Sequence, residues 1–168
     1  MRALVQSVPA MLVFCLVACA APPAVPASAP VPSPEQLVRD ADALDRAFVN
    51  AFNQGDPAAL SALYWNSPDV VSVAPDVFEP AVGIESLREA NMKALAGMPG
   101  ARVEILQSRQ VPAGEVVIGS GTARITIPGQ PPTELLVRFT DVKGQRDGKW
   151  VYLMDHVSMS AAPSPAKP

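Results

Sequence analysis

The chain has 168 residues, a length that accommodates one domain with additional terminal segments. Its formal net charge is −3 and it shows no basic patch, which argues against nucleic acid as a partner. Apolar residues make up 49% of the chain and 19 residues are prolines, but both are concentrated at the two ends. The stretch between the ends therefore has an ordinary globular composition, sufficient for one hydrophobic core.

Residues 1–18 are predicted to be a secretory signal peptide. Arg2 precedes an apolar run from Val8 to Ala18, which is shorter than the roughly 20 residues that a spanning helix needs. The run ends in "LVAC", which resembles the lipobox of bacterial lipoproteins. The resemblance implies an acylated Cys19 as the mature N-terminus, and Ala20 after it favours the outer membrane, facing the periplasm. The alternative is an ordinary signal peptide cleaved after "ACA".

The segments on either side of the domain are predicted to be extended. Residues 19–34 are rich in alanine and proline, which favours a tether with a reach of roughly 40 Å. Residues 161–168 have a similar composition and are predicted to be a disordered tail. Because Cys15 lies within the leader, Cys19 is the one remaining cysteine, which excludes an internal disulfide and a cysteine-based metal site.

The domain, residues 35–160, is predicted to begin with helices. Ser33, Pro34 and Gln36 form a helix-start pattern, and Gly55 ends the helix. Its apolar face is formed by Leu37, Ala41, Leu44, Phe48 and Phe52, and its polar face by Arg39, Asp42, Asp45 and Arg46. A second helix follows Asp56, a short strand covers 70–73, and a third helix runs from Ile84 to about Ala96.

From Arg102 onward the apolar period changes to two, which predicts four strands. The turn sequences "PAG", "PGQPP" and "KGQRDG" between them favour consecutive antiparallel pairing. Helices followed by strands indicate an α+β domain with the helices on one face of a bent sheet. Gly119 and Gly121 inside a predicted strand suggest a bulge or a sharp bend.

The segments "AFVNAFNQGDPAALSALYWNSPDVV", "GIESLREA" and "DGKWVYLMDHVS", in this order, resemble the SnoaL-like branch of the nuclear transport factor 2-like superfamily. The resemblance covers residues 37–159. It implies a cone-shaped, curved antiparallel sheet wrapped around the N-terminal helices, with a pocket between them. The family includes ketosteroid isomerases, polyketide cyclases, scytalone dehydratase and members without known chemistry, so the fold alone does not assign a function.

Strict alternation along the last strand places Trp150, Tyr152, Met154, His156 and Ser158 on one face. The resemblance implies that this face points into the cone. His156, the only histidine, is then the candidate general acid or base, and the alternative is a histidine fixed by hydrogen bonds for packing. Tyr64 and Trp65 are predicted to be pocket wall or core. The candidate ligand-binding set is Trp150, Tyr152, His156, Tyr64 and Trp65.

The remaining polar candidates have ordinary alternatives. Asp69 is either functional or a turn residue, and Asp76 and Glu79 are either at the mouth of the cone or simply solvated. Arg138 either contacts a ligand anion or faces solvent. Phe48 and Phe52 stand where the steroid isomerases carry a tyrosine as oxyanion donor, which counts against isomerase chemistry. One histidine and no available cysteine favour no metal site, and no cofactor is predicted.

The prediction for the whole chain is a lipid-anchored cell-envelope protein whose SnoaL-like domain binds a small apolar ligand or a protein partner. The alternative is an enzyme of isomerase, cyclase or dehydratase type that uses His156 as general acid or base, with the balance against an enzyme. A third hypothesis is a structural homodimer, because both faces of the last strand are largely apolar.

Overall fold

The structure is a computed structural model of the chain, and it describes residues 32–75 and 77–159. These residues belong to one compact unit that begins at Pro32. The predicted signal peptide, Cys19, the tether as far as residue 31, Asp76 and the tail lie outside the described residues. Within the described part, no helix combines the length and the apolar character needed to cross a bilayer.

Helix α1, Pro34–Gln54, begins and ends where its sequence signals predict. Ser33 is the N-cap, and its Oγ accepts the backbone N–H of Gln36 at 3.2 Å. The side chain of Gln36 bonds to Asp40 instead of returning to Ser33, so only half of a capping box forms. Gly55 closes the helix with φ of 65°, a left-handed conformation that glycine adopts without steric cost.

The other two helices differ in how closely they follow the prediction. Helix α2, Pro57–Ser61, is capped by Asp56 but ends early. The chain leaves the helix because residues 63–65 pair with the last strand: the N–H of Trp65 donates to the carbonyl of Tyr152, and the N–H of Tyr152 to the carbonyl of Leu63, both at 2.9 Å. Helix α3, Ile84–Gly97, matches the prediction within one residue.

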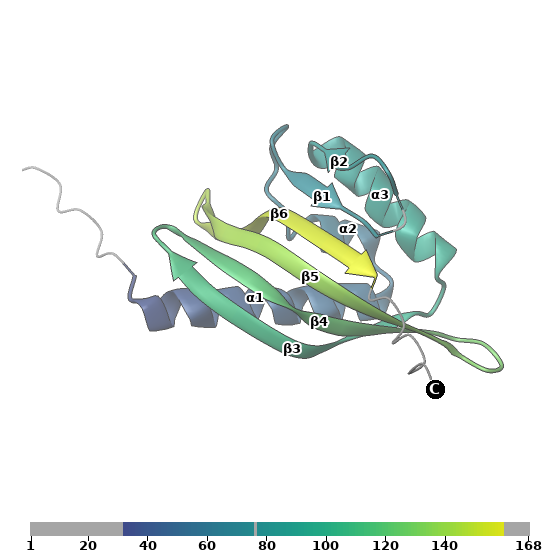
Figure 1. Cartoon of the computed structure of the whole chain (residues 1–168). Coiled ribbons are helices and arrows are strands. Elements are labelled where there is room, and N and C mark those ends of the chain that lie inside the picture. Colours follow the sequence, from purple (N-terminus) through teal and green to yellow (C-terminus); the bar gives the residue numbers. More distant parts are fainter. Residues whose placement is uncertain (1–31, 76, 160–168) are drawn as a thin grey trace, which may run out of the picture. The chain divides into compact units, whose positions relative to one another are not determined.

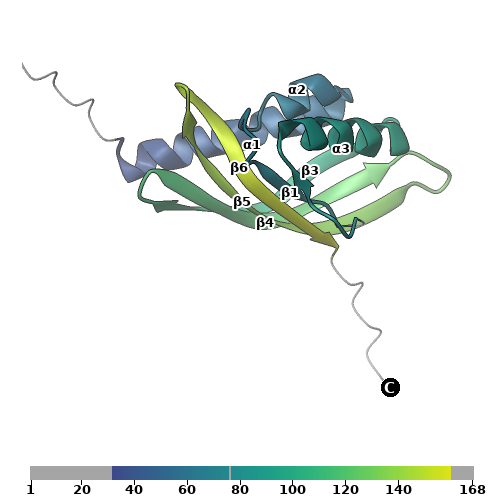
Figure 2. The same cartoon turned by 90° about the horizontal axis from the view of Figure 1, so that it is seen from above.

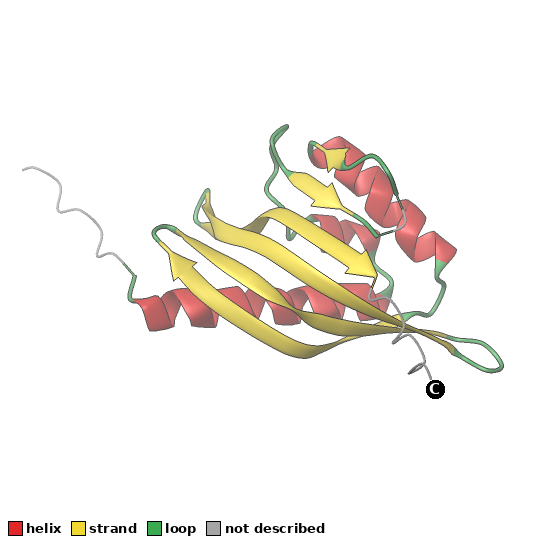
Figure 3. Ribbon diagram, in the orientation of Figure 1, coloured by secondary structure: helices red, strands yellow, loops and turns green. Residues whose placement is uncertain are grey.

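The sheet has six strands in the order β2-β1-β6-β5-β4-β3 (Figures 1 and 3). The strands are β1 Val71–Val73, β2 Ala81–Val82, β3 Arg102–Ala113, β4 Val116–Ile127, β5 Thr133–Arg146 and β6 Lys149–Met159. The four long strands pair consecutively and antiparallel, as predicted. The prediction of a wholly antiparallel sheet misses one pair, because β1 is parallel to β6. It also misses β2, which lies in the proline-rich segment before α3.

All three helices lie on one face of this sheet (Figure 2). The core between the layers consists of three apolar clusters. One joins the C-terminal half of α1 to β3, β4 and β5, a second lies around Tyr64 and Tyr152, and a third joins Leu37 and Ala41 to Val117. We call the helix-covered face of the sheet the concave face and the opposite one the outer face.

Two bulges set the curvature of the sheet, and neither lies in the glycine-containing strand β4. Leu106 is the extra residue in β3, between Ile105 and Gln107, and Leu153 is the extra residue in β6. Gly121 pairs with Ser108, close to the β3 bulge, and a Cβ on Gly121 would collide with the backbone oxygen of Gln107. The glycine therefore accommodates a bulge in the neighbouring strand.

Candidate functional site

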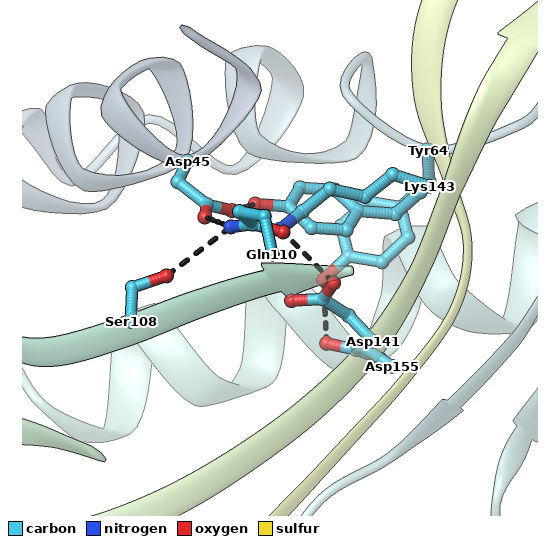
Figure 4. A network of polar contacts seen from close by, with 8 residues as sticks. Asp45, Tyr64, Ser108, Gln110, Asp141, Lys143 and Asp155 are labelled. Carbon is cyan, nitrogen blue, oxygen red and sulfur yellow. Dashed lines mark hydrogen bonds and ion pairs between the residues drawn. The ribbon is translucent and has the colours of Figure 1, made fainter. Parts of the chain in front are cut away.

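A network of charged and polar side chains occupies the concave face of the sheet, with the ammonium group of Lys143 at its centre (Figure 4). Lys143 extends from β5 and is fully buried. Its Nζ lies 2.8 Å from Asp45 Oδ1 and 3.0 Å from Asp141 Oδ1, and it donates to Gln110 Oε1 at 3.2 Å. Two carboxylates and one amide oxygen thus surround the ammonium group, and their attraction offsets part of the cost of burying its charge.

Asp45 connects helix α1 to three strands of the sheet. Its Oδ1 accepts the hydroxyl of Tyr152 at 2.6 Å, and its Oδ2 accepts the amide of Gln110 at 2.6 Å. Gln110 also donates to Ser108 at 3.1 Å. Because Ser108 is exposed and Gln110 partly exposed, these two residues of β3 form the edge of the network that water reaches.

A second pair lies deeper, between the segment after α2 and strand β6. The hydroxyl of Tyr64 donates to Asp155 Oδ2 at 2.8 Å, and both residues are buried. The rings of Tyr64 and Tyr152 lie 5.2 Å apart, so the two tyrosine–aspartate pairs stand side by side. In the part of the chain that the structure describes, no group of three or more histidine, cysteine or acidic side chains could hold a metal ion.

Burial shifts the protonation equilibria of this network. It raises the pKa of Asp141 from 3.8 to about 6, against the opposing effect of the Lys143 ammonium. Burial also raises the pKa of Asp155, opposed by hydrogen bonds from Ser72 and Tyr64. The pKa values of both tyrosines lie well above 10, first because of burial and then because of the adjacent carboxylates. Asp141 thus gains or loses its proton about two pH units above an ordinary aspartate.

Gly119 of β4 provides the space that this cluster requires. A Cβ at this position would lie 2.7 Å from Lys143 Nζ and 2.9 Å from Gln110 Oε1, and still closer to an oxygen of Asp141. The side chains of the network thus pack directly against the β4 backbone. Neither the groove across β3, β4 and β5 nor the hollow beside Pro68 and Gly83 is lined by Asp45, Asp141 or Lys143.

The prediction that His156 shares a face with Trp150 and Tyr152 is wrong. Leu153 is an extra residue in β6, so the alternation reverses after Tyr152. Asp155 consequently points to the concave face, and His156 pairs with Thr140 on the outer face, where both side chains are exposed. His156 therefore lies outside the cone, and the catalytic role predicted for it there has no geometric support.

The four aromatic residues of the predicted ligand-binding set do lie on the helix side, but in different clusters. Tyr64 and Tyr152 are buried together, and Trp65 packs at the edge of their cluster, where Arg146 stacks over its ring at 5.4 Å. Trp150 packs separately against Leu37, Ala41 and Val117. Binding of a ligand by Tyr64, Trp65, Trp150 and Tyr152 stays a prediction.

The other predicted polar candidates lie apart from the network. Asp69 is exposed, and its N–H bonds to Ser67 in a turn. Glu79 is exposed in the loop before β2, and Asp76 is outside the described residues. Arg138 is exposed on the outer face, where it lines a groove.

Sequence reasoning missed most of the network, although part of it carried a signal. Val137 and Phe139 face the core, and continuing their alternation along β5 places Asp141 and Lys143 on the same concave face. Two charges on a core-facing series indicate a buried ion pair. Asp45, assigned to the polar face of α1, is in fact buried, and its spacing of four residues from Ala41 and three from Phe48 is a signal that places it on the apolar face.

The comparisons with known proteins agree with this fold. The family model described as a SnoaL-like domain matches residues 46–153, which is more than half of the chain. The chain belongs to the SnoaL-like family. No curated protein is similar enough in sequence to match this SnoaL-like chain. At the fold level, the SnoaL-like domain is an open, curved, mixed six-stranded sheet with few helices.

Three solved structures, each less than 25% identical to this SnoaL-like domain, share its fold. A Streptomyces avermitilis protein, provisionally named a dehydratase of the nuclear transport factor 2-like family, is 19% identical with a TM-score of 0.69, covering 77% of this chain and 100% of its own. A Xanthomonas campestris protein, provisionally named a calcium/calmodulin-dependent protein kinase II association domain, is 21% identical with a TM-score of 0.64, covering 86% and 94%. A Novosphingobium aromaticivorans protein, provisionally named a scytalone dehydratase, is 12% identical with a TM-score of 0.64, covering 74% and 84%.

Proposed function

We propose that this protein is a lipid-anchored binding protein of the cell envelope, whose SnoaL-like domain associates with a second copy of itself through the outer face of its sheet. The anchor is the acylated Cys19, and the Ala/Pro-rich tether holds the domain away from the membrane surface. The observation that carries the association is a continuous apolar row across the outer face.

The row consists of directly paired residues on four neighbouring strands: Val111, Ile118, Val142 and Met154. Val111, Ile118 and Met154 have 42%, 42% and 39% of their surface exposed. Exposed apolar residues are common singly, but a row in register across a sheet is a contiguous patch, which is typical of an interaction surface. A second copy turned by a two-fold rotation presents the same row, so the surface is self-complementary.

The comparisons and the interior of the cone both favour association. A similar structure from Xanthomonas campestris carries the name of an association domain. On the concave face, Lys143 is fully buried among its partners, so a ligand could contact it only if the network moved.

Sedimentation equilibrium of the chain from Ala20 onward tests the proposal. Replacing Ile118 and Met154 by glutamine puts two neutral polar groups into the row, and we expect the dimer dissociation constant to rise by roughly tenfold or more. Met92→Gln on α3 is the matched control, because Met92 is 55% exposed on the helix side and should not alter the constant. A monomer at all concentrations, or equal effects of both changes, would contradict association through this face.

A second candidate function is acid–base catalysis on a small molecule within the cone, supported by the buried Asp141 carboxyl with a pKa of about 6 beside Lys143. Two similar structures carry dehydratase names. In this alternative Asp141, and not His156, exchanges the proton, and Gln110 has to move to admit the substrate.

Elimination of water from β-hydroxy carbonyl compounds, followed by absorbance of the conjugated product, tests this candidate. If Asp141 is the base, Asp141→Asn should lower turnover by about 100-fold or more, whereas His156→Gln should leave it unchanged. The role of Asp141 would be rejected if no compound in a panel of this kind were turned over, or if His156→Gln also lowered the turnover.

A further inference from the structure

We infer that the outer face of the sheet also carries a binding site for a tetrahedral oxyanion, a phosphate group, held between Arg109 and Arg138. A groove of about 650 Å³ runs across β3, β4 and β5 at this point, and both arginines line it. This site is separate from the concave-face network, and it adjoins the apolar row, which lies two residues further along each strand on the same outer face.

Register explains how the groove forms. Two cross-strand rows of outward side chains bound it, one made of Arg109, Ser120 and Thr140, the other of Gln107, Thr122 and Arg138. Between the rows run Ser108, Gly121 and Phe139. The side chain of Ser108 bonds to Gln110 on the concave face, and that of Phe139 packs into the core. The backbone of these residues therefore forms the floor of the groove.

The two arginines stand at opposite corners of the groove, two strands and two residues apart. This offset separates their Cα atoms by roughly 12 Å. Two arginine side chains are long enough to reach across this distance and contact one ion between them. The hydroxyls of Ser120, Thr122 and Thr140 lie along the same groove and supply further donors. Such a set of donors from several directions suits the four oxygens of a phosphate better than the two of a carboxylate.

The charges of the neighbouring positions distinguish these arginines from the others on the same face. Arg124 lies 3.4 Å from a Glu104 oxygen and 3.7 Å from a Glu134 oxygen, so two carboxylates compensate it. Among residues 32–75 and 77–159, no carboxylate forms an ion pair with Arg109 or Arg138. The groove therefore has uncompensated positive charge in a chain whose net charge is negative.

Titration of the chain from Ala20 onward with inorganic phosphate, followed by amide NMR shifts, tests the site. We expect saturable shifts at Ser120, Thr122 and Thr140, and a dissociation constant roughly tenfold higher or more in the double variant Arg109→Gln and Arg138→Gln. Arg124→Gln is the matched control on the same face and should bind phosphate as the wild type does. The proposal would be overturned if chloride at equal ionic strength caused the same shifts, or if Arg124→Gln lowered the affinity for phosphate as much as the double variant does.

Cosedimentation with vesicles identifies the source of the phosphate group. Retention on vesicles containing phosphatidylglycerol, but not on pure phosphatidylcholine, with loss in the double arginine variant, assigns the group to a lipid headgroup. Phosphate binding without such retention assigns it to a soluble phosphate ester. If the double arginine variant binds inorganic phosphate and phosphatidylglycerol vesicles as well as the wild type does, the site is refuted.

The Ile118→Gln and Met154→Gln variant separates this inference from the proposed self-association. Because the groove is built within one chain, this variant should bind phosphate with unchanged affinity even where it no longer dimerises. Loss of phosphate binding together with loss of the dimer would show that one chain does not complete the site.

Discussion

At the scale of single residues, Gly119 shows how a backbone position determines what the core can hold. It is buried in β4, and the side chains of Asp141, Lys143 and Gln110 approach it more closely than a Cβ would allow. The buried ion pair needs room on the concave face, and a glycine on the neighbouring strand leaves that room because it has no side chain. The glycine and the buried charges are therefore parts of one feature.

Gly119→Ala should destabilise the domain by about 1–3 kcal/mol, because the added methyl group displaces a packed, hydrogen-bonded network. The free energy of unfolding in urea measures the change. Gly97→Ala is the control, since a Cβ at Gly97 meets nothing within 4 Å and alanine there should be neutral or stabilising. Equal effects of the two substitutions would mean that the network adapts without cost.

The raised pKa of Asp141 makes the stability of the domain depend on pH. Because the folded-state pKa is about 6 and the ordinary value 3.8, the folded protein binds a proton between these values that the unfolded chain has released. This contribution is present below about pH 4, declines as pH rises, and is lost above about pH 6.

The unfolding free energies of the wild type and of Asp141→Asn, measured at pH 4.5 and pH 7, check this prediction. The wild type should lose about 2 kcal/mol relative to the variant over that interval, at about 1.4 kcal/mol for each pKa unit crossed. Glu115→Gln in the exposed β3–β4 turn is the control and should leave the pH dependence of the wild type in place. A wild type that gains stability relative to Asp141→Asn with rising pH would show that the sign is wrong.

At the scale of elements, the bulge at Leu153 determines what β6 presents to each face. Before the bulge, Trp150 and Tyr152 point inward, and after it Asp155 and Val157 do. The bulge thus places Asp155 beside Tyr64 and moves His156 to the outer face. A change of one residue in register exchanges the faces of half a strand.

Deletion of Leu153 should give a folded domain, because Tyr152 and Met154 then occupy consecutive positions opposite Lys143 and Val142. We expect a cost of about 1–3 kcal/mol from lost curvature and from a weakened Tyr64–Asp155 contact. Deletion of Val151, a regularly paired residue, should instead turn Trp150 outward and prevent folding. Circular dichroism and thermal unfolding distinguish the two, and equal tolerance of both deletions would contradict the role of the bulge.

At the scale of the whole molecule, the proposed anchor decides where the binding surfaces operate. If Cys19 is acylated, every domain is held within reach of the membrane by the Ala/Pro-rich tether, which raises the local concentration available for pairing through the outer face. Self-association on the membrane then needs only a modest intrinsic affinity.

Intact-mass measurement on the membrane fraction tests the anchor. A chain that begins at Cys19 and carries acyl groups is expected, and Cys19→Ala should release the protein from the membrane. Ser33→Ala serves as the control, because it weakens only the cap of α1 and leaves the anchor unchanged. A soluble mature chain with a free Cys19 thiol would contradict the lipoprotein hypothesis.

The sequence by itself determined the local elements and their order. Ser33, Pro34 and Gly55 define α1, and the period-two strands with their turns define the four-strand meander, because caps, turns and periodicity act within a few residues of one another. Together with the quoted segments, this order was enough to identify the SnoaL-like fold.

Only the tertiary structure decided which side chains meet. Neither bulge carries a local signal, since Leu106 and Leu153 are ordinary apolar strand residues, and the extra residue exists only relative to a neighbouring strand. The meeting of Asp45 with Lys143 and Tyr152 joins positions about a hundred residues apart. Burial and register are properties of the assembled sheet, and they place Asp155 and the buried ion pair, in place of His156, at the centre of the concave face.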